Sequence, residues 1–291
     1  MAASRSQSTR RSVIAGTWYP GTEKSLARAV DDYVALVDQP PVAGQLLGLI
    51  SPHAGYPYSG QTAAYAYNQL QGQNVDTVVL IGPSHRARVG DYAVSTEDAY
   101  ETPLGRVPLD LAFIGDLEER VSLHRIQGDV EHSLEIQLPF LQRQLAGFRL
   151  APIMMSADDP DVCQRLAVAL DEIIRQRAAG GERVLLVASS DLHHIENYDD
   201  VVRRDREVVS AVAAFDLERL TSLLMARDCS VCGRMPILVL LHAARLLGAD
   251  AVKVLHQTNS GDVTGQRRSG GYTVGYMAAA VFRSQPDPAA L

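Results

Sequence analysis

Leu46-Leu47-Gly48-Leu49-Ile50-Ser51-Pro52-His53 joins an apolar run, typical of a buried strand, to a tight turn and a histidine. The design recurs where the apolar residues 78–81 lead through Gly82-Pro83-Ser84 to His85. A third apolar run, residues 184–188, leads to Ser189-Ser190-Asp191-Leu192-His193-His194. Parallel strands bring their carboxyl ends to one edge of a sheet, where open α/β proteins place ligand sites. We therefore expect these three polar clusters to meet in space.

Strands and helices alternate through the rest of the chain, which predicts a single α/β domain with a central, mostly parallel or mixed sheet flanked by helices. Hydrophobic periodicity, capping residues and apolar runs locate the elements. We expect helices over residues 59–70, 134–147, 159–177, 199–214, 216–226 and 236–247. We expect strands over residues 46–50, 76–81, 148–154, 184–188, 251–255 and 272–282. The domain is predicted to span residues 13–283, between loose polar tails at residues 1–12 and 284–291.

Composition excludes several classes of protein. The 291 residues are 46% hydrophobic and 21% charged, as in ordinary globular domains. A net charge of −7 gives no basic footprint for nucleic acid, so we expect no such partner. The sequence has neither an apolar stretch of roughly 18 residues for a membrane span nor a secretion signal. Its three cysteines are too few for a disulfide framework, and we expect a cytoplasmic protein.

His53 and His85 occupy equivalent positions after two predicted strands that follow one another in the chain. Prolines and glycines fix the His53 loop, in which Tyr56 and Tyr58 are candidate walls of a pocket. A lone loop histidine usually has a structural or surface role. Two at matching strand ends favour a shared metal or catalytic site.

The 189–194 cluster supplies Asp191, His193 and His194. An aspartate there can act as a metal ligand, a general base or a carboxylate that orients an imidazole. The alternative is a helix N-cap with exposed histidines. Adjacent histidines do not point the same way from one backbone, so we expect only one of them to face the site, and the sequence does not say which.

Cys232 lies shortly before the helix predicted to begin at Pro236. The positive end of that helix and the neighbouring Arg234 favour a thiolate, the form that binds metal or attacks carbon. The Cys229-Ser230-Val231-Cys232 spacing has no second pair to complete a zinc site. The alternative is that Cys232 is a small buried core residue.

These motifs resemble the Memo family, whose prokaryotic members are called AmmeMemoRadiSam system protein B. Five ordered segments carry the resemblance, at residues 51–60, 82–85, 131–141, 189–194 and 232–236. Gly16-Thr17-Trp18-Tyr19-Pro20 and Ser269-Gly270-Gly271-Tyr272 extend it to about residues 12–283. The resemblance implies the fold of class III extradiol dioxygenases of the LigB type, which hold non-haem Fe(II) with two histidines and a glutamate.

Carried over by position, the resemblance implies that His53 and His85 are metal ligands and that Cys232 stands where the dioxygenases have their carboxylate. It implies that His194 is the acid/base histidine, with Asp191 beside it. His132, from the 131–141 motif, would line the pocket or support it. Replacing the carboxylate by a softer thiolate shifts the preference towards Cu(I) or zinc, while iron stays compatible with the imidazole ligands. With the iron of the dioxygenases in view, the expected metal is Fe(II) or Cu(I/II), with zinc also possible. The family name further implies a pathway shared with a radical SAM protein and an AMMECR-type protein.

Three hypotheses for function follow. The first is a metal-binding redox protein or oxidoreductase that uses His53, His85 and Cys232. The second is a metal-free thiol hydrolase or transferase in which Cys232 attacks, His194 takes its proton and Asp191 orients the imidazole. The third is a non-catalytic module for a small-molecule, peptide or phosphopeptide ligand. Its anion contacts would come from Arg86, Arg88 and Arg234.

Overall fold

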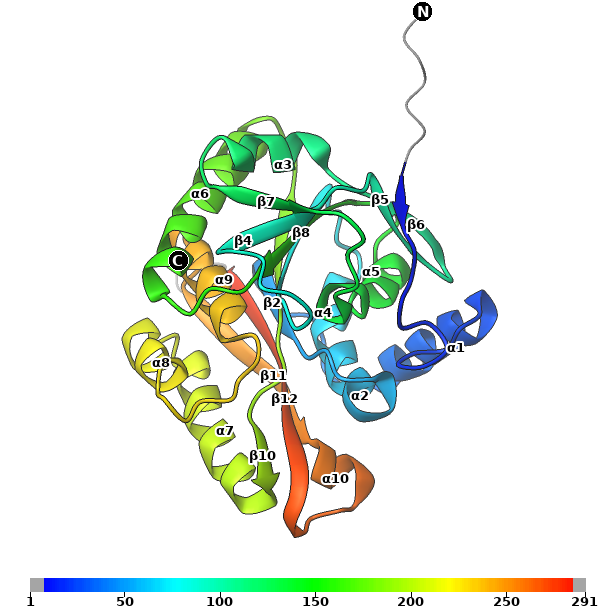
Figure 1. Cartoon of the computed structure of the whole chain (residues 1–291), viewed down its shortest axis with the longest axis vertical. Helices are drawn as coiled ribbons and strands as arrows, with labels where there is room; N and C mark the ends of the chain where they lie inside the picture. The colour runs from blue at the N-terminus through cyan, green and yellow to red at the C-terminus, as the bar shows by residue number, and fades with distance from the viewer. Residues whose placement is uncertain (1–7, 285–291) are drawn as a thin grey trace, which may run out of the picture.

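A nine-stranded mixed sheet forms the centre of the computed structural model, which describes residues 8–284 (Figure 1). Its strand order is β10-β12-β2-β9-β3-β8-β4-β7, and β11 also pairs with β12. The strands are β2 (Gly44–Ser51), β3 (Thr77–Pro83), β4 (Tyr92–Ser95), β7 (Leu123–Ile126), β8 (Arg149–Met155), β9 (Val184–Ser189), β10 (His194–Asn197), β11 (Ala251–Asn259) and β12 (Ser269–Ser284). The fold is therefore α/β, as predicted.

The four central strands, β2, β9, β3 and β8, run parallel to one another. Ser51 pairs with Ser189, and Ile81 pairs with Ala188, so three strands end at nearly the same level. This register confirms the expected convergence, because the loops that carry the histidine clusters all leave the same edge. The long strand β12 crosses the sheet antiparallel to β2.

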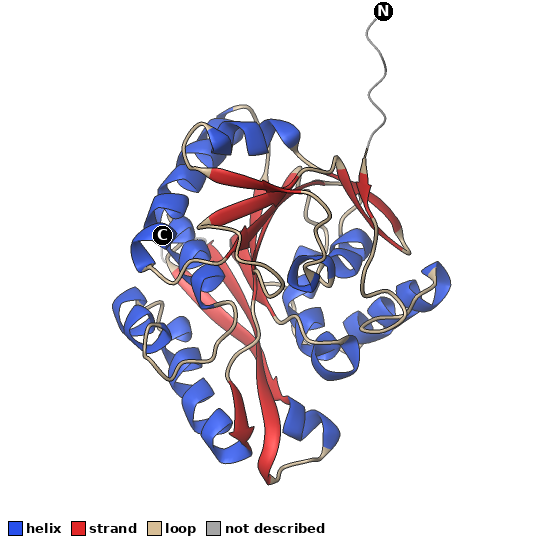
Figure 2. Cartoon of the chain, viewed as in Figure 1, coloured by secondary structure: helices blue, strands red, loops and turns tan. Residues whose placement is uncertain are grey.

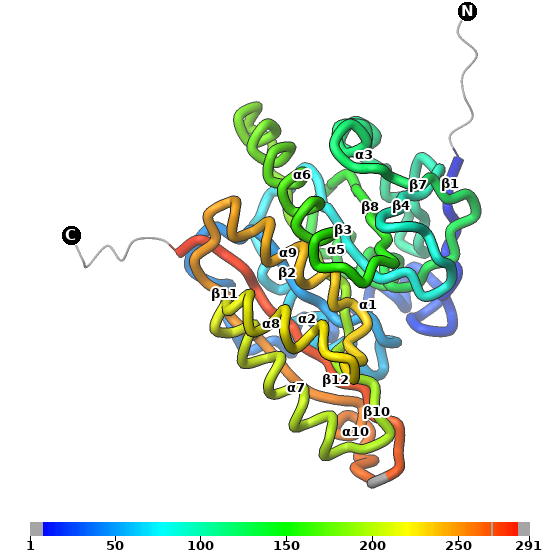
Figure 3. The backbone as a smooth tube through the Cα atoms, turned by 60° about the vertical axis from the view of Figure 1, so that its left-hand side comes forward, coloured from blue at the N-terminus to red at the C-terminus, as the bar shows by residue number. Residues whose placement is uncertain are grey.

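Helices cover both faces of the sheet (Figure 2). One layer contains α6, α7, α8 and α9, of which α9 packs on β2, β3 and β9; these helices come to the front in Figure 3. The opposite layer contains α1, α2 and α5, with α2 against β2, β11 and β12. The helices are α1 (Glu23–Ala35), α2 (Tyr56–Tyr67), α3 (Leu111–Glu118), α4 (His132–Glu135), α5 (Leu138–Gln144), α6 (Pro160–Ala179), α7 (Tyr198–Ala213), α8 (Leu217–Leu224), α9 (Arg234–Leu246) and α10 (Ser260–Thr264).

One predicted helix is divided in two. The leucine spacing from Leu134 to Leu145 predicts a continuous helix, but α4 ends at Glu135 and α5 begins at Leu138. Pro139 lies in the first turn of α5, where a residue without an N–H is tolerated, whereas inside a longer helix it would break a hydrogen bond. The break lets the short helix α4 project His132 towards the edge where the strands end.

The prediction of a loose N-terminal tail is wrong for residues 8–12. Thr9–Arg10 forms β1, which pairs with β5 (Ala99–Thr102), and β5 in turn pairs with β6 (Gly105–Pro108). Arg10 is buried and forms ion pairs with Asp129 at 3.1 Å and with Glu135. A polar segment is ordered here because buried carboxylates neutralise its arginine. Residues 1–7 and 285–291 of the predicted tails lie outside the described residues, and Ser284 ends β12.

No helix within residues 8–284 combines the length and apolar content needed to cross a bilayer.

Candidate metal centre

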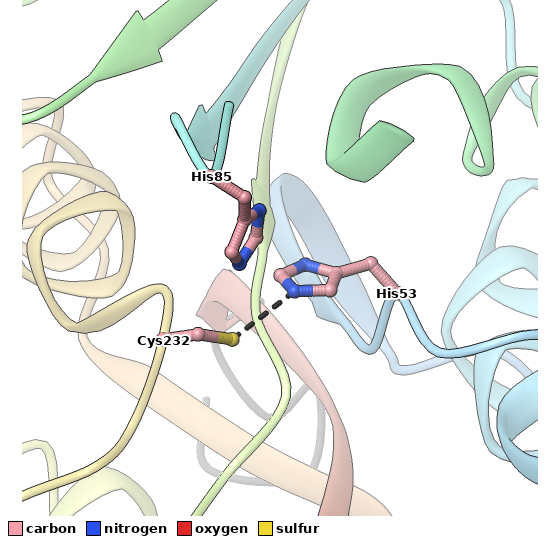
Figure 4. A group of neighbouring side chains, drawn as sticks. All are labelled: His53, His85 and Cys232. Atoms are coloured by element: carbon pink, nitrogen blue, oxygen red, sulfur yellow. Dashed lines mark hydrogen bonds between the residues drawn. The ribbon is translucent and has the colours of Figure 1, made fainter. Parts of the chain in front are cut away.

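His53, His85 and Cys232 meet at the edge of the sheet where β2, β3 and β9 end (Figure 4). His53 follows β2, His85 follows β3, and Cys232 lies between α8 and α9. One potential ligand atom from each residue lies within 4.8 Å of the others. The Cys232 Sγ is 3.1 Å from His53 Nε2. The structure thus brings together the three residues that the sequence predicts as ligands.

The hydrogen bonds of His53 fix which ring nitrogen is free. Ser189 Oγ donates to the Ser133 carbonyl at 2.6 Å and accepts from Gln137 Nε2 at 2.8 Å. Its only proton is thereby used, so His53 Nδ1, at 3.0 Å, must be the donor to Ser189 Oγ. The lone pair of His53 consequently lies on Nε2, the nitrogen that faces Cys232.

Glu131 holds His85 in the same way. His85 Nδ1 donates to Glu131 Oε1 at 3.0 Å, and the His85 backbone N–H donates to Oε2 at 2.6 Å. Burial alone would raise the pKa of Glu131, but hydrogen bonds from His85 and Ser133 bring that pKa down to about 2. The carboxylate is therefore ionised, and the lone pair of His85 lies on Nε2. Carboxylate-oriented histidines are typical of metal sites. This role of Glu131 does not follow from the sequence, in which the 131–141 motif is the only signal for it.

His132 lies beside the centre as part of the wall. Its ring stacks on His85 with centroids 4.6 Å apart and contacts Trp18 at 4.4 Å. Burial outweighs the nearby Glu131 and lowers the pKa of His132 to about 4. His132 is therefore neutral near pH 7. The position of His132 agrees with the expectation that it lines or supports the pocket.

Asp191 orients the His53 loop rather than the ring of His194. Asp191 Oδ1 accepts from the backbone N–H groups of His53 at 2.7 Å and Ala54 at 3.2 Å. Burial raises the Asp191 pKa to about 7 despite these hydrogen bonds. Within residues 8–284, His194 Nδ1 is paired instead with the Tyr272 hydroxyl at 3.1 Å. The hydrolase hypothesis needs an Asp191–His194 hydrogen bond, and the structure has a different pairing.

His194, not His193, faces the site. His194 lines the cavity described below, and its Nε2 is buried without a hydrogen-bond partner among the described residues. Burial, together with the charge of His193, lowers the His194 pKa to about 4. His193 Nδ1 instead pairs with Asp205 at 2.9 Å. The two adjacent rings therefore have separate environments, as expected for neighbouring side chains.

The expectation of a thiolate at Cys232 in the absence of metal is wrong. Desolvation raises the pKa of the Cys232 thiol, and the charge of Asp191 raises it further. Arg234 forms an ion pair with Asp158 at 2.6 Å, which neutralises the cation that was expected to favour the thiolate. Without a metal the thiol keeps its proton at neutral pH, which weakens a nucleophilic role. Metal binding releases such a proton, since the ligand is the thiolate.

A cavity of about 690 Å³ opens over the centre. Its polar groups include those of His53, His85, His132, Asp191 and His194. The rest of the lining is largely aromatic or apolar and includes Trp18, Pro57, Tyr58, Tyr272, Val274 and Tyr276. A small organic molecule fits a site of this size and composition. The centre can thus meet a ligand from this side.

Comparison with known proteins gives a consistent result. The family model described as Memo-like protein matches residues 10–280. A MEMO1 family protein of Methanosarcina mazei is 34% identical over 278 residues, covering 94% of this chain and 98% of the relative. One from Aeropyrum pernix is 37% identical over 281 residues, covering 92% and 97%. One from Pyrobaculum aerophilum is 32% identical over 288 residues, covering 94% and 99%. The chain therefore belongs to the Memo family.

Proposed function

We propose that the protein binds one iron or copper ion through His53 Nε2, His85 Nε2 and Cys232 Sγ, and that it has an oxidoreductase-type role. One observation carries the proposal. Both histidines use Nδ1 to donate to a fixed acceptor, Ser189 or Glu131, which leaves two Nε2 lone pairs beside one sulfur. Histidines whose only role is to form hydrogen bonds in the core do not need both Nε2 atoms to face the same sulfur.

The donor set fits a redox metal. Imidazole suits iron, copper and zinc, and thiolate favours the softer ions such as Cu(I) and zinc, so this set of donors is compatible with copper, iron and zinc. With 3.1 Å between Cys232 Sγ and His53 Nε2, and ligand atoms of all three residues within 4.8 Å of one another, these residues would hold a single ion. Three protein ligands leave coordination positions for another molecule, as in catalytic rather than structural sites.

When bound, the metal would supply electron transfer or activation of a ligand; the chain's own residues would control protons and access. His194 is neutral near pH 7, and its unpaired Nε2 lies in the cavity, so it can accept a proton from a bound molecule. Tyr272 holds the opposite nitrogen of that ring. Trp18 and Tyr58 line the cavity with apolar surface, which displaces water from a bound ligand.

Cytoplasmic location and a pathway shared with a radical SAM protein and an AMMECR-type protein stay predictions. Neither is needed for the metal proposal.

Elemental analysis after anaerobic purification tests the proposal. We expect one iron or copper ion per chain in the wild type, and loss of that metal in His53→Ala and Cys232→Ser. His124→Ala is the matched control, since His124 is exposed and lies outside the centre, and it should retain the metal. Full retention of metal by Cys232→Ser, with the fold checked by circular dichroism, would refute the proposed ligand set.

A further inference from the structure

A second cavity, of about 420 Å³, lies on another side of the centre. It opens between the loop after β3 and the start of α9, and both His85 and Cys232 line it. His85 also lines the larger cavity that contains Trp18. The two cavities therefore meet at the residues proposed to bind the metal.

Arginine side chains make the second cavity positively charged. Arg86 and Arg88 line it, both are exposed, and neither forms an ion pair with another described residue. Arg234 and Asp158 also line it, but they neutralise each other at 2.6 Å. The cavity thus keeps two unneutralised guanidinium groups on a chain whose net charge is −7.

Arg86 lies beside the centre. It follows His85 directly in the chain, and both residues line this cavity together with Cys232. Guanidinium groups bind carboxylate and phosphate with paired hydrogen bonds. An oxyanion in this cavity would therefore sit next to the centre.

We propose that the substrate is a small organic anion whose apolar part occupies the Trp18 cavity and whose carboxylate or phosphate group is held by Arg86 and Arg88. Such a molecule would extend past His85, the residue common to both cavities. The larger cavity favours a flat, apolar group because aromatic side chains form much of its wall. The substrate assignment rests on the proposed function, whereas the anion contacts themselves do not require a bound metal.

Trp18 makes the proposal testable by fluorescence. It is the only tryptophan in the chain, and it lines the larger cavity. Titrations would use 3-phenylpropanoate, phenyl phosphate and the neutral 3-phenylpropanamide as probes. The variants are Arg86→Gln/Arg88→Gln and the matched control Arg206→Gln/Arg227→Gln, which removes two exposed arginines that line neither cavity. The two acids separate a carboxylate site from a phosphate site.

We expect at least one acid to bind the wild type and the control equally, and to bind Arg86→Gln/Arg88→Gln about tenfold or more weakly, since a charge-assisted hydrogen bond contributes about 1.5–3 kcal/mol. The amide should bind all three proteins weakly. Equal acid affinity in all three proteins, an amide that binds as tightly as both acids, or no binding of either acid to the wild type would overturn the proposal.

The same titration on the His53→Ala protein separates this proposal from the metal proposal. Discrimination between acid and amide that persists in a protein without metal supports the anion site whatever the wild type's metal content. Metal bound normally by the wild type, with no loss of acid affinity in Arg86→Gln/Arg88→Gln, would refute the anion site and leave the metal proposal standing.

Discussion

The buried pair of His193 and Asp205 makes stability depend on pH, and Asp205→Asn should remove most of that dependence. His193 Nδ1 lies 2.9 Å from Asp205 Oδ1, and the side chains are only 5% and 2% exposed. Burial lowers the pKa of His193, but hydrogen bonds and charges from Asp205 and Cys229 outweigh burial and raise that pKa from 6.5 to about 9. A rise of this size corresponds to about 3 kcal/mol of stabilisation of the folded state.

The sign follows from the raised pKa. The folded state holds the proton more tightly than the unfolded state, so the contribution is complete below pH 6.5 and is lost as the pH rises through about 9. Asparagine preserves the shape of Asp205 and can accept the His193 backbone N–H, but it lacks the charge that favours imidazolium. We expect Asp205→Asn to be less stable than wild type by up to about 3 kcal/mol near pH 6, since Cys229 supplies part of the shift, with a much smaller difference near pH 10.

Urea unfolding followed by circular dichroism, from pH 6 to pH 10, measures the free energy of unfolding. Glu207→Gln is the matched control, because it removes one negative charge from an exposed position on the same helix, α7. A wild-type curve that shows the same slope between pH 6.5 and 9 as the Asp205→Asn curve would refute the reasoning.

Two further changes test the surroundings of the centre. Glu131→Gln should lower metal affinity by about 10–100-fold in a chelator competition, because the amide no longer fixes the His85 tautomer with a negative charge; an unchanged affinity would show that the carboxylate is dispensable. Arg10→Met should cost roughly 3–5 kcal/mol of unfolding free energy in urea, because Asp129 and Glu135 would remain buried without their cation. A loss below about 1 kcal/mol would mean that those carboxyl groups take up protons or water at little cost.

The central strands and their meeting point were predictable because the relevant signals are local. Buried parallel strands appear as continuous apolar runs, and each run here ends in a proline or serine turn before its polar cluster. The observed register places those ends level, at Ser51, Ile81 and Ser189. His53 and His85 thus followed from pattern alone, and Cys232 as their partner followed from the resemblance to the Memo family.

The features that were missed depend on contacts between distant residues. Strands β4, β5, β6 and β7 have four residues each, too few to show a period, and β1 has two. Local sequence places Arg10 in a tail because its carboxylate partners lie more than a hundred residues away. His194 faces the site while its neighbour, His193, is hydrogen-bonded to Asp205. No local pattern encodes these pairings.

The protonation state of Cys232 also depends on contacts that the sequence does not reveal. Sequence proximity to a helix N-terminus and Arg234 favoured a thiolate. Burial of the sulfur and the pairing of Arg234 with Asp158 reverse that balance. Desolvation depends on the packed surroundings, so it could not be predicted before the fold was known.

X-ray absorption spectroscopy of the metal-loaded protein tests most directly whether two imidazoles and one thiolate share an ion. For wild type we expect a first shell with one sulfur and two imidazole nitrogens, and for Cys232→Ser we expect the sulfur contribution to disappear. A wild-type spectrum fitted by nitrogen and oxygen alone, and unchanged in Cys232→Ser, would contradict a centre built from His53, His85 and Cys232.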